Sequence, residues 1–235
     1  MHDIYEIAGV KIKVNYKHPY IGAAYSEYEI GGDGYDFEVS ATDSEIEAEK
    51  AFISDLSAPQ YENLAIFRKI ADAMLESYNA LVFHSSAISY NGKGILVAAK
   101  SGTGKSTLNR RISVSAPAAT EYINDDKPII RLIDGVWYVF GTPWMGKHRL
   151  GKNVKVPLKA IILLTRGENK AKKISGLDAL KELFTQTVRA KTASVADTEI
   201  KLFENLIKNV SFIRYSCLNE DSAATYIIET VLEKL

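Results

Sequence analysis

One short segment limits the possible folds of this chain more than any other: Ala99–Ser106, which reads Ala-Lys-Ser-Gly-Thr-Gly-Lys-Ser. It fits the pattern of a phosphate-binding loop, with Ala99 in the place of the usual first glycine. An apolar run of strand type, Ile95–Ala98, precedes it, and Ser106–Ile112 can open a helix after it. The sequence therefore predicts a strand, a phosphate-binding loop (P-loop) and a helix in direct succession.

A loop of this kind surrounds the phosphates of a nucleotide with backbone N–H groups and a helix N-terminus. We expect Lys105 to reach the outer phosphates and the hydroxyl of Ser106 to hold Mg²⁺. The alternative is a glycine-rich turn with a solvated lysine, but the strand and helix on either side favour a nucleotide site. The residues expected to bind the nucleotide are Ser101, Gly102, Thr103, Gly104, Lys105, Ser106 and Thr107.

The strand that enters this loop is preceded by a hairpin signal. Leu81–Tyr90 reads as a strand run, and Asn91-Gly92 joins it to the strand of the loop. In most doubly wound phosphate-loop proteins that strand has parallel neighbours, reached through helical crossovers. We therefore predict an α/β fold with an α+β tendency, in which a mixed sheet has an antiparallel hairpin leading into the P-loop.

Further elements follow from the spacing of apolar residues. The patterns predict strands at 11–16, 35–39, 156–164 and 211–215, a hairpin across Asp134-Gly135, and helices at about 58–78, 178–186, 197–208 and 220–234. We expect two parts: residues 1–56 as a β-rich N-terminal lead-in packed on the main domain, and residues 57–235 as the P-loop domain.

Composition excludes several classes of protein. Lysine plus arginine and aspartate plus glutamate are both 29 in 235 residues, so no overall field attracts nucleic acid or a membrane surface. One cysteine, Cys217, permits no intramolecular disulfide and suits a reducing compartment. The first residues have no basic start and apolar run of a signal peptide. We expect a cytoplasmic protein that binds neither nucleic acid nor membrane.

Asp125-Asp126 is the best candidate for the acidic group that a phosphate loop needs as a partner for Mg²⁺ or the acceptor. Adjacent carboxylates on an extended segment diverge, so one can face a metal and the other a hydroxyl. A solvated aspartate pair at a strand end explains the residues equally well.

A resemblance favours the functional interpretation. His84, the loop Ser101–Ser106 and Asp125-Asp126 resemble the catalytic domain of HPr kinase/phosphorylase, which is related to ATP-dependent phosphoenolpyruvate carboxykinase. Over about residues 57–230 the chain is more similar to a stand-alone group of HPr-kinase-like bacterial proteins. The further matching segments are 123–128, 141–147, Asn153, 156–161, Gln186 and Arg189.

The resemblance implies roles for individual residues. Lys105 would neutralise the outer phosphates, Ser106 would bind Mg²⁺, and Asp126 would accept the proton of the attacking hydroxyl. Asp125 would help to position the metal, and His84 matches an active-site histidine, although a histidine satisfied within the hairpin is the alternative.

Three further residues have less specific assignments. Lys147 would contact the γ-phosphate or an anionic substrate, or be an ordinary surface lysine. Trp144 is interpreted as a core residue, with the wall of the acceptor pocket as the alternative. Arg189 would be a transition-state cation or a solvated arginine at a helix end.

The implied function is an enzyme: an ATP- and Mg²⁺-dependent kinase that phosphorylates a hydroxyl, with a serine of a protein or peptide as acceptor. The alternatives are a kinase of a small hydroxylated metabolite and a nucleotide-binding regulatory module with little catalysis. The glutamate-containing segment that supplies phosphorylase chemistry in the family has no counterpart, so phosphorolysis and HPr as substrate stay open. The resemblance also suggests a ring-like homo-oligomer.

Overall fold

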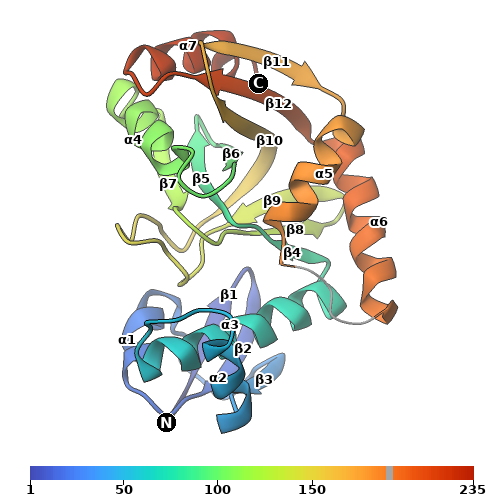
Figure 1. The fold of residues 1–235 in the computed structure, drawn as a ribbon. Helices are drawn as coiled ribbons and strands as arrows, with labels where there is room; N and C mark the ends of the chain where they lie inside the picture. Colours follow the sequence, from blue (N-terminus) through green and yellow to red (C-terminus); the bar gives the residue numbers. More distant parts are fainter. Residues whose placement is uncertain (189–192) are drawn as a thin grey trace.

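The computed structural model describes residues 1–188 and 193–235, which form a small sheet below and a large curled sheet above (Figure 1). The small sheet has the order β1-β2-β3, with strands His2–Ile7, Val10–Asn15 and Phe37–Ser40. The large sheet contains β4 (Ala80–Val82), β5 (Ser85–Tyr90), β6 (Lys93–Ala98), β7 (Thr120–Asn124), β8 (Ile129–Ile133), β9 (Val136–Phe140), β10 (Lys155–Arg166), β11 (Lys170–Ile174) and β12 (Ser211–Cys217).

Helices cover both faces of the large sheet. The helices are α1 (Tyr20–Tyr25), α2 (Asp43–Lys50), α3 (Ala58–Ser77), α4 (Lys105–Ser115), α5 (Gly176–Gln186), α6 (Ala193–Asn209) and α7 (Ser222–Thr230), with 3₁₀ turns η1 (Ser26–Tyr28) and η2 (Leu232–Lys234). One apolar core lies between the sheet and α4 and α7, and another lies between its opposite face and α5 and α6 (Figure 1). The molecule is therefore an α/β layered structure around a mixed sheet, as predicted.

The predicted hairpin into the loop is confirmed. Strands β5 and β6 pair antiparallel from Ser85↔Ala98 to Tyr90↔Lys93. Asn91 and Gly92 have φ of 49° and 74°, as a two-residue type I′ turn requires. The second predicted hairpin, between β8 and β9, has the same geometry at Asp134-Gly135.

The run 81–90, predicted as one strand, is two strands with a break at Phe83-His84. Strand β4 pairs with β8, whereas β5 pairs with β6 and β7. At the break, the N–H of Phe83 donates to Pro128 O (3.1 Å) and the N–H of His84 to Gln186 O (2.6 Å). The backbone thus leaves one ladder for another, and the break places His84 at the start of β5.

Strand β10 joins the two halves of the large sheet. Its first residues pair antiparallel with β9, and its later residues pair parallel with β6 and β12, with a register shift between Leu158 and Ala160. At the crossing point, a Cβ added to Gly94 of β6 would lie 2.5 Å from Val139 Cγ1 and 3.1 Å from Pro157 O. Glycine at this position is what permits β6 to approach β10 where the sheet curls.

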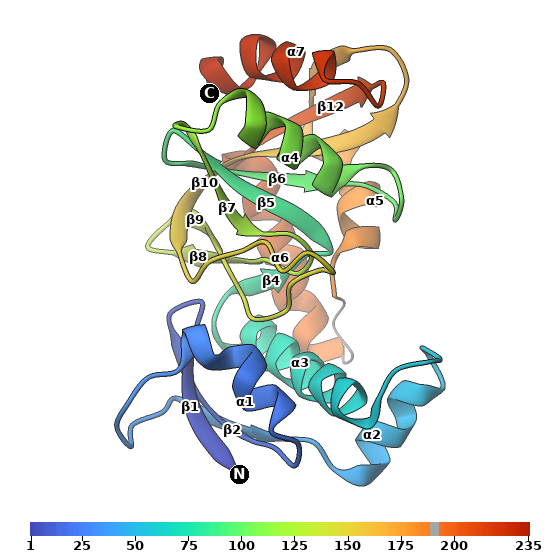
Figure 2. The ribbon, with the colours of Figure 1, turned by 90° about the vertical axis from the view of Figure 1, so that its left-hand side faces the viewer.

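The small sheet packs on α3, and α3 lies between that sheet and the rest of the chain (Figure 2). This core combines residues of β1 and β2 with Ile66 and Ile70 of α3, Ile129 of β8, and Trp144. Arg131 of β8 also ties the two parts together, because it donates to the carbonyls of Ala8 and Gly9. The expected division into residues 1–56 and 57–235 stays a prediction, since apolar packing is continuous across it.

Some elements are not foreseen by the sequence patterns. The acidic stretch before α3 contains α2, which a capping box between Thr42 and Glu45 begins. Strand β11 is an edge strand with three exposed lysines, Lys170, Lys172 and Lys173, which discourage pairing with another chain.

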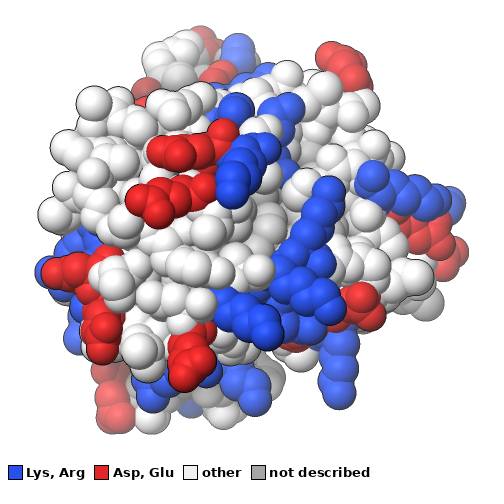
Figure 3. All heavy atoms as spheres, turned by 90° about the horizontal axis from the view of Figure 1, so that it is seen from above, with Lys and Arg blue, Asp and Glu red and all other residues white. Residues whose placement is uncertain are grey.

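Figure 3 shows the upper face of the molecule, where basic side chains gather in a band beside a smaller acidic group. Among the described helices, none combines the length and the apolar character needed to cross a membrane.

Candidate functional site

Five strand ends meet at one edge of the large sheet, and they bring the predicted site residues to that edge. Strands β7, β6, β10 and β12 all end there, and β5 begins there, because β5 is antiparallel to β6 and β7. Along the edge, in the order of the strands, lie Asp125-Asp126, His84, the loop 99–104, Arg166 and Cys217. The carboxyl ends of parallel strands are the usual place of ligand sites in open α/β sheets.

The loop between β6 and α4 has the backbone conformation that its glycines allow. Gly102 and Gly104 have φ of +76° and +119°, which residues with a side chain rarely adopt. Gly104 is the N-cap residue of α4, and no side chain caps this helix. The first N–H groups of α4 therefore lack a side-chain acceptor, which makes this end of the helix suited to an anion.

Lys105 is the first residue of α4, and its side chain folds back into the loop. It is buried, with 9% of its surface exposed, and its Nζ donates to Ala99 O at 3.0 Å. Burial lowers the pKa of Lys105, while the negative charge of Asp126 acts in the opposite direction. A buried ammonium with one carbonyl as partner would gain from an anion placed in the loop.

Asp126 is held between two basic side chains. Its Oδ1 is 3.3 Å from His84 Nε2, and its Oδ2 accepts a hydrogen bond from Lys127 Nζ at 3.0 Å. Burial alone would raise the pKa of Asp126, but the hydrogen bond from His84 and the charge of Lys127 outweigh it, so that the pKa is below its ordinary value. The carboxylate is therefore ionised at neutral pH.

The carboxylate of Asp125 has other partners than His84 and Lys127, as expected for adjacent residues of an extended segment. Its Oδ1 accepts from the N–H of Gly146 at 2.6 Å, and only 6% of the residue is exposed. The preceding residue, Asn124, fixes the backbone that follows the pair, because its Oδ1 accepts from the N–H groups of Asp126 and Lys127 at 2.8 and 2.7 Å. The two carboxylates thus have different partners and can have different roles.

The donor set fits Mg²⁺ of the kind that binds through phosphates. Mg²⁺ retains several waters and needs one or two carboxylates besides the phosphates of its substrate. Oδ2 of Asp125 accepts no hydrogen bond from any described residue, and Ser106 is the second residue of α4, next to the loop. Within the described part of the chain, no three histidine, cysteine or acidic side chains converge on a metal position. The roles of Asp125 and Ser106 as metal ligands stay predictions.

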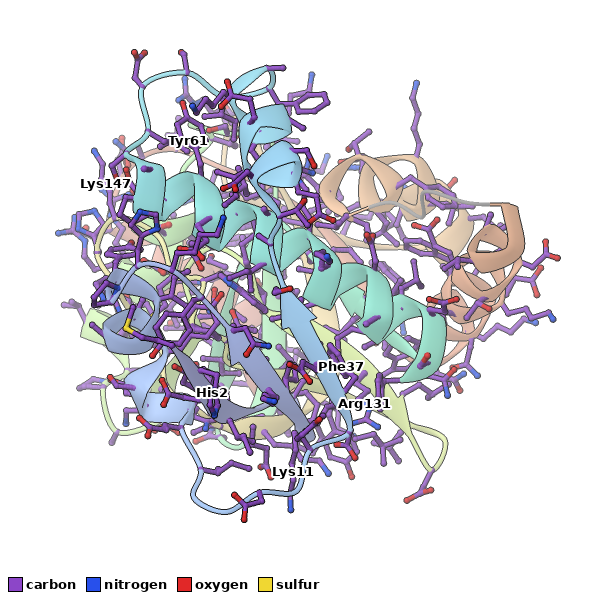
Figure 4. The ribbon with its side chains drawn as sticks, turned by 90° about the horizontal axis from the view of Figure 1, so that it is seen from below. His2, Lys11, Phe37, Tyr61, Arg131 and Lys147 are labelled. Carbon is purple, nitrogen blue, oxygen red and sulfur yellow. The ribbon has the colours of Figure 1, made fainter. Side chains whose placement is uncertain are left out.

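The remaining predicted residues are less closely grouped. Lys147 is exposed, at the outer edge of the molecule in Figure 4, and no described residue forms a hydrogen bond or ion pair with it. Its role as a phosphate contact stays a prediction. Trp144 is buried, which confirms the core interpretation. Arg189 lies outside the described residues.

Several residues at the edge are not predicted as site residues. Arg166 donates from Nη2 to Gly102 O at 2.6 Å and so fastens the loop to the end of β10. The amide nitrogen of Gln186, in the orientation that satisfies its neighbours, donates to His84 O at 3.2 Å and Ala99 O at 3.0 Å. Lys127 could have been found from the sequence, because it directly follows the acid pair. Nothing near Arg166 in the sequence marks it as a site residue, because the pairing of β10 with β6 brings it to the loop.

Two cavities flank the loop. A cavity of about 410 Å³ lies toward β12, and Thr107, Leu108, Arg111, Arg166, Cys217 and Leu218 are among its lining residues. Another of about 300 Å³ lies between the loop, the end of β10 and α5, and includes Thr185 and Gln186. Arg111 holds one wall of the larger cavity, since it donates to Asn219 Oδ1 (2.7 Å), Asn219 O (3.0 Å) and Asp221 Oδ1 (2.9 Å).

No protein-family model and no curated protein sequence matches the chain. Among solved structures, the chain is similar to one described as the Hpr(Ser) kinase/phosphatase from Coxiella burnetii, with 11% sequence identity and a TM-score of 0.36. The similarity covers 65% of this chain and 97% of that one. A likeness this distant carries no argument about the activity of the chain.

Proposed function

We propose that this protein is an ATP- and Mg²⁺-dependent kinase that transfers the γ-phosphate to a hydroxyl, with a serine of a protein as the acceptor. The observation that carries the proposal is the order of groups along the sheet edge. A glycine-rich loop with a buried lysine has an ionised carboxylate, Asp126, and His84 on one side and a cavity of nucleoside size on the other.

The loop would bind the phosphates through its backbone N–H groups and Lys105. Positioning and neutralisation of charge account for most of the catalysis of phosphoryl transfer. Ser106 and Asp125 would hold Mg²⁺, which supplies further neutralisation of the outer phosphates. Arg166 would keep the loop in place through its bond to Gly102 O.

Asp126 would orient the acceptor hydroxyl and take its proton. In the transfer, the hydroxyl oxygen forms a bond to the γ-phosphorus, the bond from that phosphorus to the bridging oxygen breaks, and ADP leaves. His84 would keep Asp126 in place and stabilise its negative charge before the transfer, at their separation of 3.3 Å.

The nucleoside would occupy the cavity of about 410 Å³. The acids lie beyond β5 on the β7 side of the loop, so the γ-phosphate and the acceptor belong on that side. The sugar and base must then extend the other way, toward β10 and β12. Apolar lining from Leu108 and Leu218, with polar groups at the rim, is typical of small-molecule sites of this size.

The proposal is tested by transfer of radiolabelled γ-phosphate from ATP, with Mg²⁺, into lysate of the native host. We expect label in a discrete protein band with the wild-type protein and none with Asp126→Asn or Lys105→Ala. Label in a small-molecule fraction would replace the protein acceptor with a metabolite. Tight ATP binding without labelling or hydrolysis, equal in all three proteins, would contradict the kinase.

A further inference from the structure

The loop of residues 141–152, called here the bridging loop, contacts both the acid pair and the N-terminal part of the chain. In Figure 2 it runs between the end of the large sheet and helices α1 and α3. Its two sets of contacts come from residues only two positions apart, Trp144 and Gly146. A displacement of Trp144 would therefore also displace Gly146 and its contact to Asp125.

The contacts toward the site hold the acid pair from several directions. The N–H of Gly146 donates to Asp125 Oδ1 at 2.6 Å. A Cβ at Gly146 would lie 3.1 Å from Asp125 Oδ2, so the backbone of the loop lies directly against the carboxylate. Thr142 accepts from Asn124 Nδ2 at 3.0 Å and donates to Lys127 O at 2.7 Å.

The contacts on the opposite side go to the N-terminal part. Nε1 of Trp144 donates to the hydroxyl of Tyr25 at 2.6 Å, and this hydroxyl donates to Asn63 Oδ1 of α3 at 2.7 Å. The Trp144 ring also packs edge-on against Tyr25 and Phe67, with ring centroids 6.0 and 4.8 Å apart. Tyr25 has no exposed surface, and burial raises its pKa, so its hydroxyl is a neutral hydrogen-bonding group.

We propose that residues 1–56 act as a positioning element for the acid pair, through the chain of contacts from Tyr25 to Trp144 to Gly146 to Asp125. Tyr25 is a positioning residue: it fixes Trp144, and the bridging loop then fixes the carboxylate that would face Mg²⁺. This inference rests on the proposed function for the role of Asp125, but the coupling itself concerns only the protein.

Two buried tyrosines make a matched pair for the test. Tyr25→Phe removes a hydroxyl that bonds to Trp144 and Asn63. Tyr28→Phe removes a hydroxyl equally buried, at 1% exposure of the residue, that has no hydrogen-bond partner among the described residues. Both variants keep the aromatic ring in the same part of the fold, but only Tyr25→Phe removes a hydrogen bond to the bridging loop.

The first measurement is amide hydrogen exchange of the ligand-free protein. We expect Tyr25→Phe to accelerate exchange in the bridging loop while β5 and β6 keep the wild-type rate, and Tyr28→Phe to leave both unchanged. Trp144→Phe should reproduce the effect, and the double variant Tyr25→Phe/Trp144→Phe should add little to it. Equal exchange in all variants, or equal acceleration over the whole chain, would overturn the proposal.

The second measurement is the Mg²⁺ concentration that half-saturates ATP turnover. Partners of a metal ligand change metal affinity by about 10–100-fold when they are removed. Because Tyr25 acts on Asp125 only through Trp144 and Gly146, we expect a rise of at most this size in Tyr25→Phe, with an unchanged KM for ATP at saturating Mg²⁺ and no change in Tyr28→Phe. A change in KM for ATP with an unchanged Mg²⁺ requirement would contradict positioning of Asp125. A wild-type protein that binds no ATP would refute the proposed function, and the exchange measurement would still decide the coupling.

Discussion

Lys105 and Asp126 show that the partners of a buried charged group decide how well its charge is compensated. Burial disfavours the charged form of both, but Asp126 has His84 and Lys127 beside it, whereas Lys105 has the carbonyl of Ala99 and the more weakly felt charge of Asp126. The ligand-free loop therefore contains an incompletely compensated positive charge. An anion in the loop would supply the missing partner.

Lys105→Met should distinguish the effect of the lysine charge on ATP binding from its effect on the stability of the folded protein. The folded-state pKa of Lys105 is below its ordinary value, so folding is opposed by its charge at neutral pH. Removal of the charge should raise the free energy of unfolding, and with it the melting temperature. ATP should protect the wild type against thermal unfolding and leave the variant unaffected. A variant less stable than the wild type without ligand would contradict this account of the charge.

The pH dependence of stability should depend on Asp126. Its folded-state pKa is lowered, so it contributes stability above the ordinary aspartate pKa of about 4, and this contribution disappears as the pH falls through the folded value. Asp126→Asn should be less stable than the wild type at neutral pH, and the difference should shrink below about pH 4. Denaturant unfolding at several pH values measures this. Asp33→Asn, at an exposed turn carboxylate, is the control and should show no such convergence.

Protection of Cys217 should report where the nucleoside lies. This residue lines the larger cavity, and burial raises the pKa of its thiol. Because little thiolate is then present at neutral pH, we expect alkylation to be slow and to be measured best at alkaline pH. ATP should slow the alkylation by about tenfold or more, and inorganic triphosphate should not, because only a nucleoside would reach the cavity. Equal protection by both would place the base elsewhere.

At the scale of elements, the sequence predicted those parts of the fold that local chemistry determines. Asn91-Gly92 and Asp134-Gly135 adopt positive φ at both positions, which few residue pairs accept, and both hairpins are present. The break at Phe83-His84 could not be predicted, because the break depends on hydrogen bonds to Pro128 and Gln186, which come from distant parts of the chain. Strand β11 depends likewise on pairing with β12, more than 35 residues away in the chain.

The acid pair illustrates the same limit within the site. The sequence indicates that Asp125 and Asp126 diverge, but the partners that distinguish them, Gly146 and His84, come from other elements. For Lys147, one residue beyond Gly146, the sequence supports a phosphate contact and a surface lysine equally, and its exposure in the structure leaves that role a prediction.

Gly94 is a position where strands approach closely, so its substitution should be costly. Gly94→Ala would bring a Cβ to 2.5 Å from Val139 Cγ1 and 3.1 Å from Pro157 O, which forces β6 and β10 apart. Overpacking of this kind costs about 1–3 kcal/mol. Denaturant unfolding should show this loss for Gly94→Ala and almost none for Gly31→Ala, where the added Cβ would meet nothing within 4 Å. Equal stability of the two variants would contradict the tight crossing.

For the whole molecule, the main point is that α3 belongs to a core that both parts share. Its buried side chains pack against β1 and β2 as well as against Trp144, and Arg131 forms a second connection. Removal of residues 1–56 should therefore expose an apolar face of α3 and abolish cooperative thermal unfolding of residues 57–235. Differential scanning calorimetry measures this. A single transition at the wild-type temperature would instead establish residues 57–235 as an independent domain.

The β5–β6 hairpin also determines which changes of chain length the site can tolerate. Six consecutive pairs fix His84, next to Ser85, relative to Ala99, next to Ala98. Insertion or deletion of one residue in either strand would shift the histidine by about 3.3 Å and turn alternate side chains to the other face. In relatives with an equivalent site, the segment from the histidine to the first residue of the loop should therefore keep a constant length.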